Sequence, residues 1–421
     1  MGNTPPNTLL EPFRVLDLSD ESGVLCGRIL ADLGADVIKI EPPGGDAMRQ
    51  IGPFYHDIPD PEKSLYWFTF NTSKRSITLD ITKPEGQSIF KKLAQTADFV
   101  IECFYPGFME KMGMGYDDLN RTNSRIVMTS ITPYGQSGPY AEYKSSDITA
   151  LAMGGLMYLM GDPDRPPVRV SAQQAYAQAG AQAAAGTMVA HYHRETSGEG
   201  QHVDVSMQEA VSNTLDTTQQ GWDLQKLIFK RTGCSRALGD RVVRAVYPCK
   251  DGYMACWSPN DLNVFVQWLK DAGFAEDAAE LAGLIDIWEQ IEGGTLSLSQ
   301  ALTQEELDRF QELRMPFLKA HTKAELYKKA FEHHFGWVPV QTPMDLVEYA
   351  QLKTRGYFVD VDHPELGCSI TYPGAPYKLS RTPWRIKNRA PLMGEHNQEI
   401  YREELGFTKN DMQAMKKAAI I

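Results

Sequence analysis

Residues 14–40 read RVLDLSDESGVLCGRILADLGADVIKI. The apolar run at 14–18 predicts a buried strand. The pattern through residues 28–33 predicts a helix that ends at Gly34, because glycine readily adopts the backbone conformation of a helix C-terminus. A second apolar run, at 36–40, predicts another strand. A strand, a helix and a parallel strand within about 27 residues form a βαβ unit, so this stretch predicts an α/β fold.

The same alternation continues along the first third of the chain. Apolar runs at residues 76–80, 98–102 and 125–131 predict strands, and residues 84–93 predict a helix with proline in its first turn. We therefore expect an open, mostly parallel, Rossmann-like sheet in a large domain. No Gly-x-Gly-x-x-Gly motif follows the first strand, and residues 20–27 begin with two carboxylates. This argues against a nicotinamide dinucleotide site.

Changes of pattern along the chain predict two domains. We expect a large α/β domain whose N-terminal part is residues 1–220, a smaller, largely helical α+β domain at 221–335, and a return to the large domain with a C-terminal tail at 336–421. In the small domain, residues 247–253 are typical of a turn between strands, and residues 260–330 are mostly amphipathic helix. The tail from Tyr357 predicts short strands and turns.

A long helix rich in alanine and glutamine is predicted at residues 174–194. Small residues recur on one of its faces, namely Ala175, Ala179, Ala183 and Gly186. This pattern predicts a helix that packs at close range against its neighbours and needs no ligand to explain it.

The composition excludes several classes of function. Of the 421 residues, 42% are hydrophobic and 23% are charged, as in an ordinary globular protein. The formal net charge of −12 argues against a nucleic acid partner, because phosphate backbones require a basic surface. No stretch approaches the ~20 apolar residues that a membrane span requires.

The termini and cysteines point to the cytoplasm. The first residues, MGNTPP, lack the basic region and apolar run of a signal peptide. The six cysteines show no Cys-x-x-Cys motif and no spacing with histidines that would indicate a metal site. We therefore expect a cytoplasmic protein with reduced thiols, no bound metal and no membrane association.

Tyr176 lies at a distinctive position, near the start of the alanine-rich helix and at a fixed spacing from a glycine-containing turn. It opens the alanine-rich helix, and it lies 25 residues before Gln201 of the turn Gly198-Glu-Gly-Gln201. Around it the chain resembles the class III CoA-transferases, the family of formyl-CoA and carnitine CoA-transferases, over nearly its whole length. Further segments that carry the resemblance are VLDLS (15–19), LADLGADVIKIE (30–41), GGD (44–46), NTSKRSITLD (71–80), KPEG (83–86), GFMEKMGMGY (107–116), GQSGPY (135–140), DHPELG (362–367), LSRTP (379–383) and APLMGEH (390–396).

The resemblance implies a nucleophilic aspartate at the position of Tyr176. In the family this Asp attacks the thioester carbonyl to form a mixed anhydride and free CoA thiolate, and CoA then attacks the enzyme carboxyl to form an aspartyl-CoA thioester. A tyrosine cannot enter that cycle. Its phenol has a pKa of about 10, and an aryl ester offers no enzyme carbonyl for CoA to attack. The sequence therefore predicts no catalytic residue at this position.

Other positions depart from the family in the same region. Cys103 and Tyr105 replace an Asn and an Arg, Pro42 stands where some members have Arg, and Ser146 replaces a Tyr. The loop after the first strand carries Asp20 and Glu21, which would repel the phosphates of CoA. These departures together indicate that natural selection no longer maintains the pocket around Tyr176.

Three cations match positions that lie near the CoA nucleotide in the family. They are Lys74, Arg75 and Lys111. Lysine and arginine offer charge-assisted contacts to phosphate, although each could equally be an ordinary solvated or structural cation. The resemblance implies CoA or acyl-CoA as a substrate and no tightly bound cofactor.

The resemblance also implies an interlaced dimer. The leading hypothesis is the Asp-less, non-catalytic subunit of a heteromeric CoA-transferase, paired with a homologous Asp-bearing subunit. Its closest counterpart in character is the Asp-less subunit of the two-subunit succinyl-CoA:benzylsuccinate CoA-transferase of anaerobic aromatic degradation. Such a complex moves CoA between acids such as succinyl-CoA and an aromatic dicarboxylate.

Three alternatives remain open at the level of sequence. The first is a homodimeric acyl-CoA racemase or isomerase, which requires a base pair that usually includes histidine. Asp147 and Asp162 are available, but no histidine lies between His56 and His191. The second is a pseudoenzyme that binds acyl-CoA. The third is an ordinary transferase with a displaced nucleophile, for which Asp162 and Asp164 are the nearby carboxylates.

Overall fold

The computed structural model describes residues 8–238, 241–257 and 261–421. The chain forms two compact units. The first comprises the described residues up to Met157 together with Arg169–Asp223 and Ala350–Ile421, and the second comprises Tyr158–Val168 and the described part of Leu224–Tyr349. Within these described ranges no helix combines the length and apolarity needed to cross a membrane.

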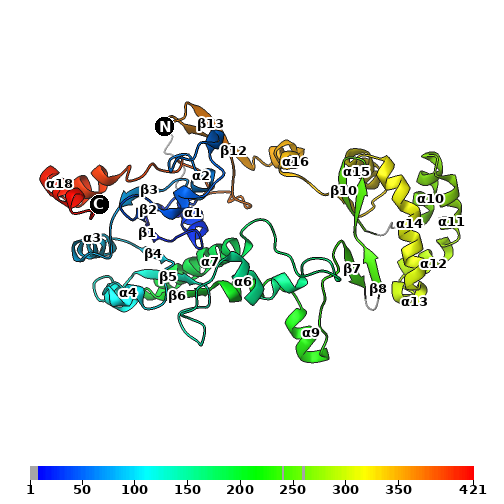
Figure 1. Cartoon of the computed structure of the whole chain (residues 1–421), viewed down its shortest axis with the longest axis horizontal. Coiled ribbons are helices and arrows are strands. Elements are labelled where there is room, and N and C mark those ends of the chain that lie inside the picture. The colour runs from blue at the N-terminus through cyan, green and yellow to red at the C-terminus, as the bar shows by residue number, and fades with distance from the viewer. Residues whose placement is uncertain (1–7, 239–240, 258–260) are drawn as a thin grey trace. The chain divides into compact units, whose positions relative to one another are not determined.

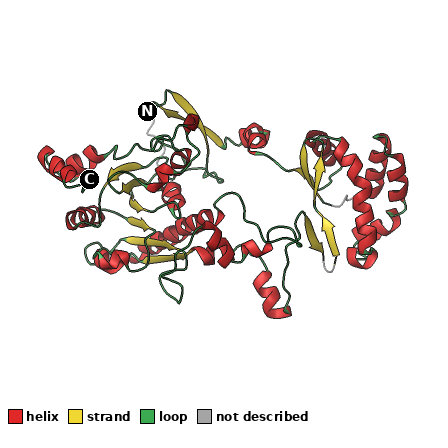
Figure 2. Ribbon diagram, viewed as in Figure 1, coloured by secondary structure: helices red, strands yellow, loops and turns green. Residues whose placement is uncertain are grey.

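A six-stranded, wholly parallel sheet forms the centre of the first unit (Figures 1 and 2). Its strands are β1 (Arg14–Leu18), β2 (Asp36–Glu41), β3 (Arg75–Thr78), β4 (Phe99–Glu102), β5 (Val127–Thr132) and β6 (His202–Ser206). The order is β3-β2-β1-β4-β5-β6, with Val15 opposite Val37 on one side and Phe99 on the other. The predicted α/β class and five of these strands are confirmed. β6 was not predicted as a strand.

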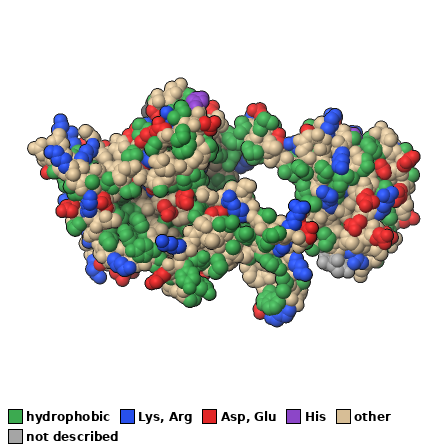
Figure 3. Space-filling view, in the orientation of Figure 1, with side chains coloured by type: hydrophobic (Ala, Val, Ile, Leu, Met, Phe, Trp, Pro, Cys, Tyr) green, Lys and Arg blue, Asp and Glu red, His purple; other side chains and the backbone are tan. Residues whose placement is uncertain are grey.

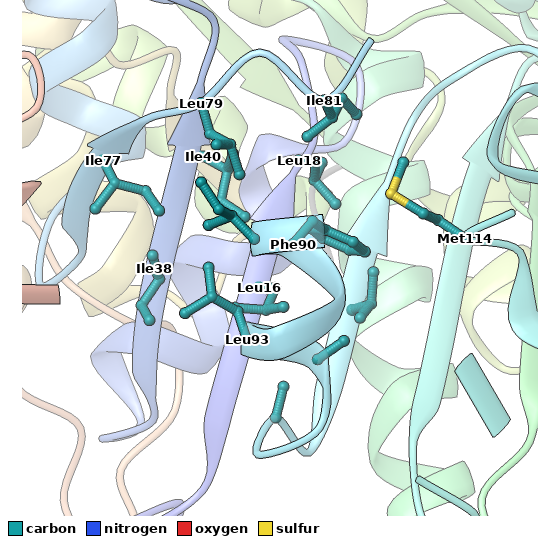
Figure 4. Close-up of a cluster of buried hydrophobic side chains, with 14 of the residues drawn as sticks. Leu16, Leu18, Ile38, Ile40, Ile77, Leu79, Ile81, Phe90, Leu93 and Met114 are labelled. Carbon is teal, nitrogen blue, oxygen red and sulfur yellow. The ribbon is translucent and has the colours of Figure 1, made fainter. Parts of the chain in front are cut away.

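Helices cover both faces of this sheet. The helices of the first unit are α1 (Val24–Asp32), α2 (Leu65–Phe70), α3 (Pro84–Ala94), α4 (Phe108–Lys111), α5 (Tyr116–Asn120), α6 (Asp147–Met153), α7 (Gln174–Ser197), α8 (Met207–Ser212), α17 (Ala350–Thr354) and α18 (Lys409–Lys417), while α9 (Thr218–Gln225) spans the boundary. Phe90 and Leu93 of α3 pack over strand residues such as Leu16 on one face (Figure 4). The core of the opposite face is built from α1, α6, α7 and α8.

The alanine face of α7 packs as predicted. Ala175, Ala179 and Ala183 are fully buried on it. A side chain at Gly180 would collide with Leu25 of α1, with 2.8 Å between the two Cβ atoms. The small residues therefore allow α7 to lie close against α1. The close backbone approach gives dispersion contacts, which compensate for the smaller apolar area that alanine and glycine bury.

The second unit is a small helical α+β body. Its strands are β7 (Ser235–Leu238), β8 (Arg241–Arg244), β9 (Val246–Cys249), β10 (Gly252–Cys256) and β11 (Trp337–Pro339), and its helices are α10 (Leu262–Asp271), α11 (Ala275–Ala282), α12 (Ile285–Glu292), α13 (Leu298–Ala301), α14 (Gln304–Ala320), α15 (Lys323–Glu332) and α16 (Pro343–Glu348). Antiparallel pairing of β9 with β10 confirms the turn predicted within residues 247–253. Aromatic side chains such as Phe265, Phe317 and Trp337 fill its core.

The C-terminal tail differs in part from the prediction. Strands β12 (Phe358–His363) and β13 (Cys368–Pro373) form the expected hairpin. The end of the chain, predicted as strands and turns, is instead helical: a π-helical turn spans Glu399–Glu404, and α18 follows. Thr408 and Asp411 form a reciprocal cap at the start of α18. Met412 and Met415 then bury one face of that helix against the α3 side of the sheet.

Candidate functional site

The strand order places a binding crevice between β1 and β4. The helix that follows β1 packs on one face of the sheet, whereas α4 and α5, which follow β4, pack on the other. Two adjacent parallel strands whose connections diverge in this way leave an opening beyond their carboxyl ends, and ligands of doubly wound sheets bind there. The loops at this point are residues 19–23 after β1 and 103–107 after β4.

A cavity of about 550 Å³ occupies this opening. We call it the switch-point cavity. It is lined by Asp20, Glu21, Ser22, Cys103, Phe104, Tyr105, Pro106, Lys111, Pro133, Ala141, Glu142, Tyr143, Lys144, Ser145, Tyr176 and Met207. Three carboxylates and two lysines therefore share a rim with three tyrosines. On the visible face of the molecule, acidic and basic side chains are likewise interspersed (Figure 3).

Tyr176 enters this cavity from the first turn of α7. Asp147, the first residue of α6, fixes that turn: its Oδ1 atom accepts hydrogen bonds from the backbone N–H groups of Ala175 at 2.9 Å and Tyr176 at 3.4 Å. Burial, together with Glu21 and Asp20 nearby, raises the pKa of the Tyr176 phenol to about 12. The hydroxyl is therefore neutral throughout the physiological pH range, and a neutral phenol is a poor nucleophile.

A second cavity of about 550 Å³ lies on the other side of Tyr176 and Glu21, which line both. We call it the aromatic cavity. Its walls are Glu21, Val24, Leu25, Ile51, Gly52, Tyr66, Phe70, Arg169, Ser171, Ala172, Gln173, Gln174, Tyr176 and Ala177. The Gln173 side chain connects Tyr66 and Glu21. Its Oε1 atom accepts a hydrogen bond from the Tyr66 hydroxyl at 2.7 Å, and the side chain also forms a hydrogen bond with Glu21. Burial and the adjacent Asp20 raise the pKa of Glu21.

Hydrogen bonds within the loop after β1 fix the position of the Asp20 carboxylate. Asp20 accepts a hydrogen bond from the backbone N–H of Ser22 at 2.9 Å and another from its hydroxyl. The thiol of Cys103, across the same cavity, is no substitute nucleophile. Burial, with Asp20 and Glu102 nearby, raises the pKa of Cys103 well above that of a free cysteine, so the reactive thiolate is suppressed.

The three predicted CoA-binding cations lie in different surroundings. Lys111 ends α4 and lines the switch-point cavity, with its Nζ 5.3 Å from the centroid of the Tyr105 ring. Lys74 is buried, and its Nζ donates to Asp17 at 2.8 Å and to Asn71 at 3.0 Å. Arg75 bridges three carboxylates at 2.6–2.8 Å, those of Asp36, Glu399 and Glu404. The structure thus brings only Lys111 of these three to the cavity of Tyr176.

The displaced carboxylates considered from sequence lie elsewhere. Asp162 and Asp164 belong to the segment Tyr158–Val168, which is part of the second unit.

Sequence reasoning did not single out Tyr66, Phe70, Arg169 or Gln173. A signal was present in the run LYWFTF at 65–70, where Tyr66 and Phe70 are spaced by four residues and so share one face of α2.

Glu102, at the carboxyl end of β4, makes stability depend on pH. Burial raises its pKa from 4.5 to about 7, although hydrogen bonds from Ser130 and from the Phe104 backbone favour the ionised form. The folded state therefore holds a proton that the unfolded state releases between about pH 4.5 and 7, and the free energy of unfolding falls as pH rises through that window.

We expect Glu102→Gln to be more stable than the parent chain by roughly 3 kcal/mol at about pH 8, and of similar stability below about pH 4.5. Urea unfolding at the two pH values measures this difference. Glu403→Gln is the matched control, because Glu403 is an exposed glutamate of the same unit that is not among the groups acting on Glu102.

Comparison with known proteins defines the family. Residues 10–397 match the model of CoA-transferase family III. The chain belongs to that family. It is 34% identical over 402 residues to the succinyl-CoA:(R)-benzylsuccinate CoA-transferase subunit BbsE of Thauera aromatica, covering 93% of each protein. It is 33% identical over 419 residues to a formyl-CoA:oxalate CoA-transferase of Streptomyces coelicolor, covering 98% of this chain and 99% of that one.

A solved structure agrees with this membership. A CaiB/BaiF family protein from Brucella suis is 26% identical to the chain and superposes with a TM-score of 0.80, covering 94% of this chain and 99% of that one. The names of the class III relatives describe transfer of CoA from one acyl group to another acid. The family thus implies CoA thioesters as substrates, and the geometry around Tyr176 decides what this member contributes.

Proposed function

We propose that the chain is the non-catalytic subunit of a heteromeric class III CoA-transferase that moves CoA between carboxylic acids such as succinyl-CoA and an aromatic dicarboxylate. The observation that carries the proposal is Tyr176. Its neutral phenol occupies the first turn of α7, at the position where the resemblance places the nucleophilic aspartate. A chain without that carboxylate cannot form the anhydride or the acyl-enzyme thioester.

The surroundings of Tyr176 support the same conclusion. Asp20, Glu21 and Glu142 line the switch-point cavity, and like charge would raise the free energy of a CoA phosphate placed there. Lys111 and Lys144 offset this only in part. The substitutions are therefore consistent with a pocket that no longer carries out the reaction itself.

A partner supplies what the chain lacks. The relative from Thauera aromatica is named as a subunit, which supports an assembly of two different chains here as well. In this proposal the partner is a homologous chain with aspartate at the position of Tyr176, and the two chains interlace as a dimer. The chain completes the fold of the complex and shapes the partner's acyl site.

An acyl-CoA racemase is less well supported by the cavities. That chemistry requires a base close to the α-carbon, usually with histidine in the pair. Among the described residues that line the switch-point and aromatic cavities there is no histidine.

The proposal is tested by purifying the protein from its native source and identifying the bound chains by mass spectrometry. We expect a companion chain of similar size that carries aspartate 25 residues before its Gly-x-Gly-Gln turn, the spacing that separates Tyr176 from Gln201. Recovery of the chain as a homodimer with no companion would contradict the proposal. Co-expression with the companion serves as the control, because both chains should then elute together.

A further inference from the structure

We propose that the aromatic cavity is a binding site for an aromatic carboxylic acid, whose ring lies among Tyr66, Phe70 and Tyr176 and whose carboxylate pairs with Arg169. The inference rests on the proposed function, because it assigns to this chain a site for the acid side of the transfer. It goes further in giving the non-catalytic chain a ligand of its own.

Three aromatic side chains form one wall of the cavity. Tyr66 and Phe70 project from the same face of α2, with ring centroids 4.8 Å apart and planes inclined by 46°. Rings at such angles leave an edge and a face available to a third ring, which is the geometry that aromatic groups prefer. The hydrogen bond from the Tyr66 hydroxyl to Gln173 fixes the orientation of that ring before a ligand arrives.

Aliphatic side chains complete the apolar part. Val24 is buried, and Leu25 and Ile51 are half-buried beside it. A volume of about 550 Å³ falls within the range of about 300–1,000 Å³ for sites that enclose small molecules. The lining is thus predominantly apolar with a few polar groups, as expected for a preformed small-molecule site.

The charges orient a ligand. Among the described lining residues, Arg169 is the sole cation, and Ser171 and Gln174 stand near it in sequence as further hydrogen-bond donors. A guanidinium presents a planar fork that matches both oxygens of a carboxylate. Glu21 lies on the wall shared with the switch-point cavity, so a ligand carboxylate is repelled there and attracted to Arg169.

Binding to the full chain, measured by calorimetry without CoA, tests the inference. The probes are 3-phenylpropionate, butyrate, which lacks the ring, and 3-phenylpropan-1-ol, which lacks the carboxylate. We expect 3-phenylpropionate to bind at least about tenfold more tightly than either of the other two, because each lacks one of the two recognised groups.

Variants separate the two contributions. Arg169→Leu should weaken 3-phenylpropionate about tenfold and leave the alcohol unchanged, since only the charged contact is removed. Phe70→Leu should weaken both aromatic probes by a similar factor. Arg165→Leu is the matched control, because Arg165 is an exposed arginine four residues earlier that does not line the cavity, and it should change nothing. Thermal unfolding verifies that each variant is folded, and Arg169 is exposed enough that its replacement spares the core.

Several results would overturn the inference. These are absence of 3-phenylpropionate binding at about 1 mM, equal binding of butyrate, or an affinity insensitive to Arg169→Leu in a folded chain. The proposed function fails on a different readout, namely recovery without a companion chain. The two failures are therefore distinguishable.

Discussion

Purified by itself, the chain is expected to transfer CoA from succinyl-CoA to a free carboxylic acid at least about 10³-fold more slowly than its complex with an Asp-bearing partner, because the covalent step has no nucleophile. The phenol of Tyr176 has a pKa raised to about 12, so its hydroxyl stays neutral across the physiological pH range. Turnover is measured by the appearance of the product thioester, with the two chains assayed separately and then combined.

A matched variant sharpens this result. Tyr176→Asp restores the expected carboxylate but leaves Asp20, Glu21, Cys103 and Tyr105 in place around the same cavity. We expect the isolated variant to remain inactive, because the neighbouring carboxylates disfavour both a new anion and the CoA phosphates. Strong rescue by this single change would show that the other departures are harmless. Turnover by the unchanged chain would contradict the proposed function outright. Loss of that turnover in Glu21→Gln would then assign the nucleophile to Glu21, which lines both cavities.

Local sequence predicted most of the first unit, because most of its strands and helices carry a clear pattern of apolar residues and end signals. In the strand at 14–18, Val15 is buried on one face of the sheet and Leu16 and Leu18 on the other, and Gly34 follows α1 with a φ of 108° that other residues rarely adopt. β6 escaped prediction because its alternating, half-buried sequence HVDVS is that of an edge strand. The helical end of the chain escaped because α18 is mostly polar, and only its capping pair marks its start.

The site was harder to predict, since its residues meet only through the topology. The resemblance placed Tyr176 in one pocket with Asp20, Glu21, Cys103 and Tyr105, whereas the residues next to Tyr176 in sequence do not by themselves show that the loops after β1 and β4 converge there. The tertiary fold alone reveals that Tyr66, Phe70 and Arg169 share a cavity, because they are up to about a hundred residues apart. The presence of two adjacent cations in the sequence likewise does not show whether their side chains are buried. Lys74 and Arg75 are adjacent in sequence, yet one ammonium is buried and the other side chain bridges surface carboxylates.

Lys74→Met should lower the free energy of unfolding by about 3–5 kcal/mol, the range found when one member of a buried ion pair is removed. The side chains of Lys74 and Asp17 are both fully buried, and their charged atoms lie 2.8 Å apart. Burial opposes ionisation of Asp17, but Lys74 and Lys39 hold its pKa below the ordinary value. Without Lys74 the carboxylate keeps only part of that compensation. Urea unfolding measures the loss.

Two further variants decide what Lys74 does. The double variant Asp17→Asn with Lys74→Met should recover part of the loss, because it leaves no unpaired carboxylate, and Lys39 retains its ion pair with Asp46 at 3.1 Å. Lys63→Met is the control, since Lys63 pairs with Asp60 at 3.2 Å on the surface and should lose under about 1 kcal/mol. If Lys74 instead served the phosphates of CoA, its replacement would leave stability unchanged and weaken CoA binding. The buried contacts to Asp17 and Asn71 lead us to expect the opposite, a loss of stability that is present whether or not CoA is added.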